Sequence, residues 1–515
     1  MLRTSLRTWT VIAVSVAALG LTACGGSSTK GSDSGGGSGG GSGGNAPNSI
    51  IYGLAAEPAN LDFTTTDGAA IPEAMLYNVY EGLVKVDQNG DIKPSLAKSW
   101  KISEDRKTYT FELQPNVKFS DGSAFDAEAV KFSIERVQSS AWKISLKTYM
   151  DVVKSVKVNS PTEVEVTLKQ PSNNWLYQMT TRIGAMFSPE GVDDLANKPV
   201  GTGPYVLDRW VRGDSVRLKE NPDYWGEKPA MKQVTLKYFK DATALNNALL
   251  SGAIDVIGTV QAPDTLSQFT SDKRFQVIEG TTNGELTMAL NNKKGPMADK
   301  RIRQALSHAI DRKAVMDAAW AGRGELIGTM DVPTDPWYED LTSISNYDPA
   351  KAKQLLAQAG KPKLTVRFRV PNLPYAVAPA QVVKSQLAKV GITAKIDVLE
   401  FPARWLDEVF TKHDYDMSIV AHVEPRDIFT FANPDYYWGY DNKEVQDLLA
   451  KGDTGTPEEQ IADTKAAARI LAEDAAAYWL YDLPSLIAAK KGISGLPKNT
   501  VAEALDLSNI TRSAD

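Results

Sequence analysis

The residues best suited to chemistry lie in the segment HVEPRDIF, residues 422–429. This segment places the imidazole of His422, the carboxylates of Glu424 and Asp427 and the guanidinium of Arg426 close together in the chain. The carboxylates could hold an ammonium group of a ligand through charge-assisted hydrogen bonds. The alternative is that Glu424 and Asp427 cap the next turn or face water, as most loop carboxylates do. Both interpretations of this segment stay open from the sequence.

His422 is one of only three histidines in the chain. An imidazole can ligate a metal ion, but metal sites need clustered donors. We expect His308 on a helix surface and His413 in a loop, so His422 has no partner of its own kind. The sequence therefore predicts no metal site and no cofactor.

Two further segments supply candidate ligand contacts. Arg404 follows a predicted strand, where its guanidinium could bind a carboxylate or a phosphate with two parallel hydrogen bonds. The segment DYYWGY, residues 435–440, could provide an aromatic wall through Tyr437 and Trp438. The alternative is packing of these rings inside the fold, which is favoured most for Tyr440.

A regular alternation of strands and helices positions these residues. The pattern predicts strands at 364–370, 393–401 and 415–421, with helices near 379–390 and 403–411. Short connections between such elements predict a parallel sheet. Ligands of open α/β sheets bind outside the carboxyl ends of the strands, which are here residues 371–375, 401–404 and 422–427.

Elsewhere the chain mixes strands and helices. Residues 108–113 and 162–168 alternate apolar and polar side chains, as half-buried antiparallel strands do. Asp126 is a predicted helix N-cap. The segment 299–322 is predicted to be helical up to Gly322, and Asp348 is predicted to begin a helix that Gly360 ends.

The N-terminal segment has the pattern of an export signal. Residues 1–23 combine two arginines with a short apolar run, which predicts a signal peptide rather than a membrane span. Cys24 is the only cysteine, so an internal disulfide is excluded. The glycine- and serine-rich composition of residues 25–46 predicts a flexible tether. LTAC, residues 21–24, resembles the bacterial lipobox, which implies lipidation of Cys24 and attachment to the outer face of the cytoplasmic membrane.

Composition narrows the functional class. The chain has 515 residues, a formal net charge of −6 and no basic runs, which argues against nucleic acid as a partner. The competing class to a binding protein is a secreted hydrolase. The sequence lacks H-E-x-x-H, and its G-x-S-x-G matches fall in the tether, where a nucleophile elbow has no strand or helix to support it. We therefore expect no enzyme, although paired glycosidase carboxylates converge only in the fold.

Five segments in order resemble the solute-binding protein family 5 of ABC importers, the dipeptide- and oligopeptide-binding group. They are residues 94–137, 199–210 (PVGTGPYVLDRW), 221–229 (NPDYWGEKP), 248–256 (ALLSGAIDV) and 299–315. The resemblance implies an α/β fold of the bilobed, periplasmic-binding-protein-like type II class, with two lobes joined by a hinge. Lobe I would be residues 48–284 with a C-terminal return at 486–515 and an extra subdomain near 83–198. Lobe II would be residues 285–485.

The resemblance also implies a ligand and partners. Peptide-binding members carry an Asp after the third strand that pairs with the peptide ammonium group, but this chain has Ala421 or His422 there. Glu424 or Asp427 would take over that role, and Asp67 lies in a loop that often meets the ligand. The implied function is capture of a short peptide for an ABC permease and its ATPase by a monomeric receptor; a non-peptide polar solute, such as an oligosaccharide or a peptide conjugate, is the alternative.

Overall fold

The computed structural model describes residues 48–513. The predicted signal peptide, Cys24 and the tether lie outside the described residues. No helix within residues 48–513 is both long and apolar enough to cross a membrane. We use lobe I for residues 48–284 with 486–513, and lobe II for residues 285–485; these boundaries remain a prediction.

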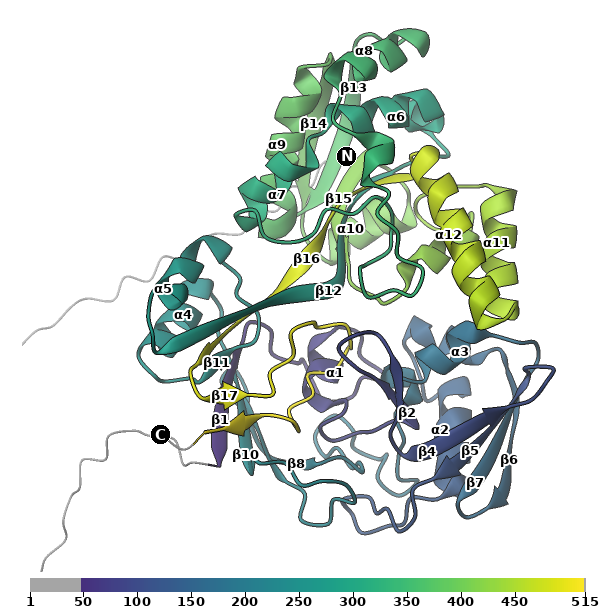
Figure 1. The fold of residues 1–515 in the computed structure, drawn as a ribbon, viewed down its shortest axis with the longest axis vertical. Coiled ribbons are helices and arrows are strands. Elements are labelled where there is room, and N and C mark those ends of the chain that lie inside the picture. Colours follow the sequence, from purple (N-terminus) through teal and green to yellow (C-terminus); the bar gives the residue numbers. More distant parts are fainter. Residues whose placement is uncertain (1–47, 514–515) are drawn as a thin grey trace, which may run out of the picture. The chain divides into compact units, whose positions relative to one another are not determined.

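A ten-stranded sheet runs through both lobes in the order β14-β13-β15-β12-β16-β11-β1-β10-β9-β8. Its strands are β1 (Ser49–Leu54), β8 (Tyr205–Val211), β9 (Ser215–Glu220), β10 (Gln233–Tyr238), β11 (Val256–Ile257), β12 (Phe275–Leu290), β13 (Leu364–Pro371), β14 (Ile392–Leu399), β15 (Met417–His422) and β16 (Ala477–Lys490). The two long strands β12 and β16 pair antiparallel and carry the chain from one lobe to the other (Figure 1).

The parallel sheet of lobe II confirms the strand–helix alternation. β13 pairs in parallel with both β14 and β15. Helix α9 (Pro374–Ala388) begins earlier than the predicted 379, because Pro374 occupies its first position, where a missing N–H costs nothing. The helix expected at 403–411 is α10 (Ala403–Trp405) followed by a π-helical turn, Leu406–Thr411.

The prediction of one helix through residues 299–322 is wrong in its middle. The chain forms α6 (Lys300–Ala309) and α7 (Arg312–Trp320), separated by an extended Ile310. The break arises because the Asp311 side chain accepts a hydrogen bond from the backbone N–H of Ala314 and so caps a new helix. Gly322 follows the end of α7 with φ +77°.

The other helices are α1 (Ala70–Met75), α2 (Ala127–Gln138), α3 (Asn173–Gln178), α4 (Ala242–Leu250), α5 (Ser267–Thr270), α8 (Pro349–Gln358), α11 (Lys443–Thr454) and α12 (Pro457–Glu473). Asp126 caps α2 and Asp348 caps α8, as predicted. The other strands are β2 (Val84–Val86), β3 (Ile92–Pro94), β4 (Ala97–Ile102), β5 (Thr108–Leu113), β6 (Val153–Ser160), β7 (Glu163–Leu168), β17 (Ile493–Ser494) and β18 (Thr511–Arg512).

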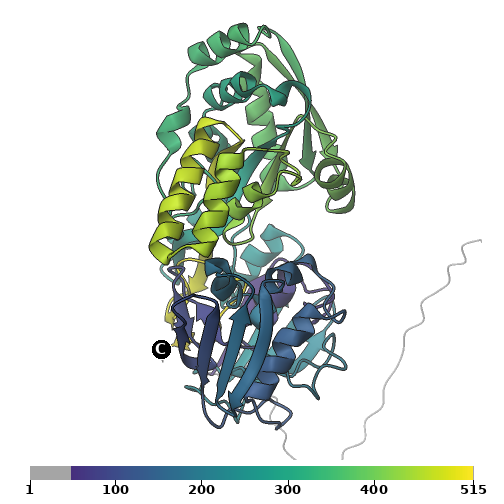
Figure 2. The same ribbon diagram turned by 90° about the vertical axis from the view of Figure 1, so that its right-hand side faces the viewer.

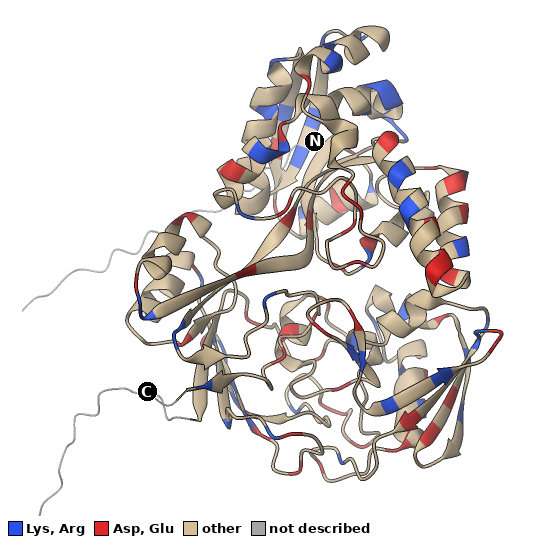
Figure 3. Ribbon diagram, in the orientation of Figure 1, with Lys and Arg blue, Asp and Glu red and all other residues tan. Residues whose placement is uncertain are grey.

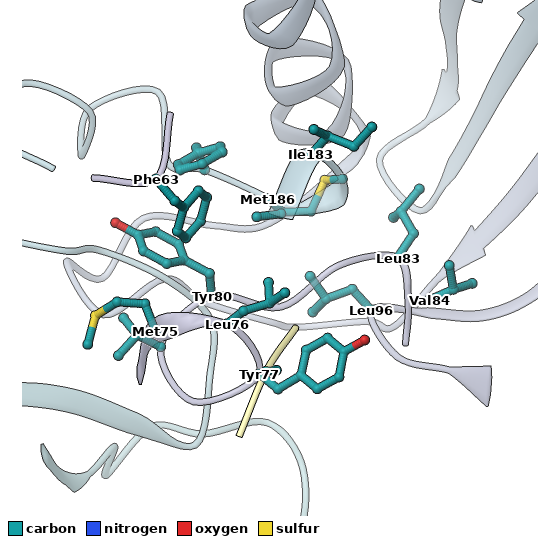
Figure 4. Close-up of a cluster of buried hydrophobic side chains, with 14 of the residues drawn as sticks. Phe63, Met75, Leu76, Tyr77, Tyr80, Leu83, Val84, Leu96, Ile183 and Met186 are labelled. Carbon is teal, nitrogen blue, oxygen red and sulfur yellow. The ribbon is translucent and has the colours of Figure 1, made fainter. Parts of the chain in front are cut away.

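Lobe I has its own antiparallel sheet, β4-β5-β7-β6, which contains both strands predicted from alternation. Its buried core includes the ring of Phe63, which packs edge-on against Tyr80 with 5.3 Å between ring centroids (Figure 4). Each fully buried side chain of this kind contributes about 1.5–3 kcal/mol. Lys and Arg are interspersed with Asp and Glu over both lobes (Figure 3).

The two lobes touch where α11 meets α3 (Figure 2). The carboxylate of Asp453, in α11, accepts hydrogen bonds from Ser172 Oγ at 2.9 Å and from the backbone N–H of Asn174 at 2.8 Å. Nearby, the Arg426 guanidinium of lobe II lies 3.6 Å from the ring centroid of Tyr177 in lobe I. Both contacts join residues that are far apart in the sequence.

Candidate functional site

A cavity of about 380 Å³ lies between the lobes, and we call it the interlobe cavity. Lobe I contributes Asp67, Glu73 and Arg182 to its wall, and the 423–425 loop of lobe II faces them. The rest of the lining is largely apolar and includes Trp320. This volume lies in the lower part of the range of small-molecule sites, and its few charged groups would orient a ligand.

Glu424 lines the interlobe cavity, whereas Asp427 does not. The difference arises in the backbone, because Arg426 adopts a left-handed conformation with φ +63°. The turn starts the 3-10 helix Asp427–Ala432, in which the Asp427 side chain is buried. Burial raises the pKa of Glu424, and the charge of Asp427 raises it further.

His422 holds Asp427 in its buried position. Its Nδ1 lies 2.9 Å from Asp427 Oδ2, and its Nε2 lies 2.8 Å from the Tyr437 hydroxyl. Because a carboxylate accepts, Nδ1 donates to Asp427, and in the neutral imidazole Nε2 accepts from the tyrosine. Tyr437 and Trp438 are buried and pack near the histidine ring, so these four residues stand behind the cavity wall.

Asp67 meets the cavity as part of an ion-pair network. Arg182 Nη1 lies 3.2 Å from Asp67 Oδ1, and Arg182 Nη2 lies 2.9 Å from Glu503 Oε1. The Arg182 backbone N–H also donates to Glu503. The Arg182 side chain is only 7% exposed, and its charge is therefore matched inside the protein.

The structure places Arg404 apart from the other candidates. Its side chain is half exposed and pairs with Glu408 one helical turn away, at 2.7 Å. It does not line the interlobe cavity. An exposed pair of this kind contributes little to stability.

Sequence reasoning found the loop around Asp67 but missed the other charged cavity residues of lobe I. Arg182 and Glu503 are separated by 321 positions, so no local pattern connects them. Glu73 lies in the short helix α1, and Tyr52 lies on β1. The proximity of Glu73 to Asp67 in the chain was the one usable signal.

His422, Glu424 and Asp427 bring one possible ligand atom each within 4.8 Å of one another. An imidazole with two carboxylates suits a divalent transition metal by donor type. In the described structure, however, the Nε2 lone pair accepts from Tyr437, and Nδ1 is bound to Asp427. The expectation of no metal remains a prediction.

A fold of two lobes around a ligand-sized cavity is the architecture of a solute-binding protein. The sequence model of one protein family, the bacterial extracellular solute-binding proteins, family 5 (middle region), matches residues 91–448. The chain belongs to this family, as the sequence motifs predicted. Members of this family are binding proteins, and those similar to this chain are extracytoplasmic.

Among curated proteins, the chain is 30% identical over 488 residues to the probable D,D-dipeptide-binding periplasmic protein DdpA of Escherichia coli. The match covers 88% of this chain and 92% of the relative. It is 32% identical to the nickel-binding periplasmic protein of Escherichia coli over 292 residues, which cover 55% of this chain and 56% of that protein.

Solved structures confirm the predicted fold class. The binding protein AgaA of A. tumefaciens R10, solved in complex with agropinic acid, matches with a TM-score of 0.75 and 26% identity over 91% of this chain and 99% of the other. DppA of Helicobacter pylori, in complex with the peptide STSA, has a TM-score of 0.77 with 23% identity and covers 90% of this chain and 98% of its own. The second likeness bears on the fold alone.

Proposed function

We propose that this protein is a lipid-anchored, non-enzymatic receptor that captures a short peptide in the interlobe cavity and delivers it to an ABC permease and its ATPase. Cys24 carries the lipid, the receptor stands on the outer face of the cytoplasmic membrane, and it acts as a monomer. The binding of one ligand by both lobes stabilises their closed arrangement.

The observation that carries this proposal is the position of Glu424. Its carboxylate stands in a largely apolar cavity, facing lobe I, while the charge of Arg182 is already matched by Asp67 and Glu503. A carboxylate in such a place favours a cationic partner, and the free ammonium group of a peptide is one. Glu424 thus takes the role that the sequence left open between Glu424 and Asp427.

The similarity to DdpA, a probable D,D-dipeptide-binding protein, supports a peptide as the ligand. A non-peptide polar solute is the second candidate, and it is favoured by AgaA, which binds agropinic acid. The two candidates use the same cavity and differ only in the ligand.

Native mass spectrometry of the purified protein, produced in rich medium, tests the proposal. Denaturation releases the bound molecules for identification, and short peptides at stoichiometric occupancy are the expected result. A single non-peptide compound would favour the second candidate, and turnover of generic peptide or glycan substrates would contradict the non-enzymatic assignment.

Glu424→Gln sharpens this test by removing the charge while keeping the shape of the side chain. Loss of one charge-assisted hydrogen bond should weaken an ammonium-bearing ligand by about tenfold to a hundredfold. Melting without ligand should stay nearly unchanged. The matched control is Glu104→Gln, an exposed carboxylate in the loop between β4 and β5. Equal affinity in the wild type and the Glu424 variant would remove Glu424 from the site.

A further inference from the structure

Glu73 is a carboxylate of the interlobe cavity that the proposed ammonium contact does not use. It lies on α1 in lobe I and is partly buried in the cavity wall. Its side chain has no hydrogen-bond or ion-pair partner among residues 48–513. The other lobe I carboxylates of the cavity, Asp67 and Glu503, are both bound to Arg182. Within the described residues, Glu73 is therefore the lobe I carboxylate of the cavity that has no ion-pair partner.

A second polar group without a partner lines the same cavity as Glu73. The Tyr52 hydroxyl, on β1, belongs to a fully buried side chain that lines the same cavity, and within the described residues it makes no hydrogen bond. The charge of Glu73 acts on Tyr52 and adds to the rise in the pKa of its hydroxyl that burial causes. Buried polar groups are almost always bonded in folded proteins, so the unbonded Tyr52 hydroxyl, at the same cavity wall as the unpaired Glu73 carboxylate, indicates a missing partner.

The chemistry of that partner follows from the two groups. A carboxylate only accepts hydrogen bonds, and a phenolic oxygen can accept as well. An ammonium group has three donors and no acceptor, and it also supplies the charge that Glu73 lacks. Burial raises the pKa of Glu73 to about 7, and a bound cation would favour its ionised form.

We propose that Glu73 and the Tyr52 hydroxyl form a second cation subsite of the interlobe cavity, so that the ligand carries two separated cationic groups. This inference rests on the proposed function: one cation meets Glu424 from lobe II, and the other meets Glu73 from lobe I. Trp320 and Ile487 line the cavity as well and provide apolar surface for a methylene chain. A short peptide with a lysine side chain has this chemistry.

Calorimetric titration of the full protein with two matched dipeptides tests the subsite. Glycyl-lysine and glycyl-norleucine share an apolar stem, but only the first ends in an ammonium group. The wild type should bind glycyl-lysine about tenfold more tightly or better, as expected for one charge-assisted hydrogen bond. In Glu73→Gln this ratio should fall to about 1 while the affinity for glycyl-norleucine changes little. Glu104→Gln should keep the wild-type ratio.

Tyr52→Phe provides a second variant that removes only the hydroxyl oxygen, for use where Glu73→Gln does not fold. It should lower the lysine preference by about threefold. A wild-type ratio near 1, or a ratio that survives in both variants, would overturn the subsite.

A peptide-independent arm separates failure of the subsite from failure of the proposed function. It compares 1,5-diaminopentane with pentylamine in the same proteins. One outcome would support the subsite and contradict the peptide assignment. In it, the wild type binds the diamine more strongly than pentylamine, Glu73→Gln loses this preference, and neither dipeptide binds. No preference for the dication in either pair would contradict the subsite itself.

Discussion

Replacing Asp453 with alanine removes a carboxylate of lobe II that accepts hydrogen bonds from lobe I. Its partners are the Ser172 hydroxyl at 2.9 Å and the backbone N–H of Asn174 at 2.8 Å. Hydrogen bonds to a charged group are worth about 1.5–3 kcal/mol each. Water replaces part of this when the lobes separate, and burial raises the pKa of Asp453, so some of the gain is offset by lost hydration. We estimate a net contribution of about 1–2 kcal/mol to the ligand-bound arrangement.

That free energy corresponds to an affinity that is about 5- to 30-fold lower in Asp453→Ala, although the residue does not line the cavity. Calorimetry with the ligand released from the native protein measures it, and stopped-flow kinetics should place most of the loss in a faster dissociation rate. Asp447→Ala is the matched control, because Asp447 lies on the same helix, is exposed and pairs with Lys443 in that helix. Unchanged affinity in Asp453→Ala would refute a role of this contact in ligand binding.

Three further predictions concern stability. Glu503→Gln should lower the free energy of unfolding by about 3 kcal/mol in urea titrations, because it leaves Arg182 buried without its main partner. The double variant Arg182→Met/Glu503→Leu should lose less stability than Glu503→Gln. A loss in the double variant equal to the sum of the two single-variant losses would contradict this reasoning. Burial raises the pKa of Glu81 to about 7, so its contribution to stability is present below pH 4.5 and lost as the pH rises through 7. Between pH 4.5 and 7, the free energy of unfolding of the wild type should fall by about 3 kcal/mol relative to that of Glu81→Gln. Parallel plots of unfolding free energy against pH for the two proteins would refute this prediction. Gly201→Ala would place a Cβ atom on the backbone oxygen of Val79 and should cost about 3 kcal/mol, so a wild-type urea midpoint would contradict the packing seen here.

Local elements were predictable where the signal is local. The strands around Tyr109 and Val164, the cap at Asp126 and the parallel β13–β15 unit follow from alternation, capping and short connections, which act within a few residues. The break between α6 and α7 was missed because the apolar stripe continues through Ile310, and the cap at Asp311 interrupts the helix without interrupting the stripe.

The candidate site was only partly predictable. The sequence placed Glu424 and Asp427 in one loop and favoured neither as the ammonium contact. The left-handed backbone at Arg426 and the hydrogen bond from His422 to Asp427 distinguish the two carboxylates. Tyr437 and Trp438 were open between an aromatic wall and packing, and burial in the described structure favours packing.

By itself, the sequence determined the family, the α/β fold and the loop that carries Glu424, because the order of motifs and the periodicity of apolar residues are properties of the sequence. Only the tertiary structure decided which charges remain unmatched in the cavity. Arg182 and Glu503 meet across 321 positions, and Arg182 is bound to Asp67 and Glu503, whereas Glu73 of the same cavity has no ion-pair partner among residues 48–513. The net charge of a cavity depends on groups that long-range packing brings together, so it cannot be predicted from a local sequence pattern.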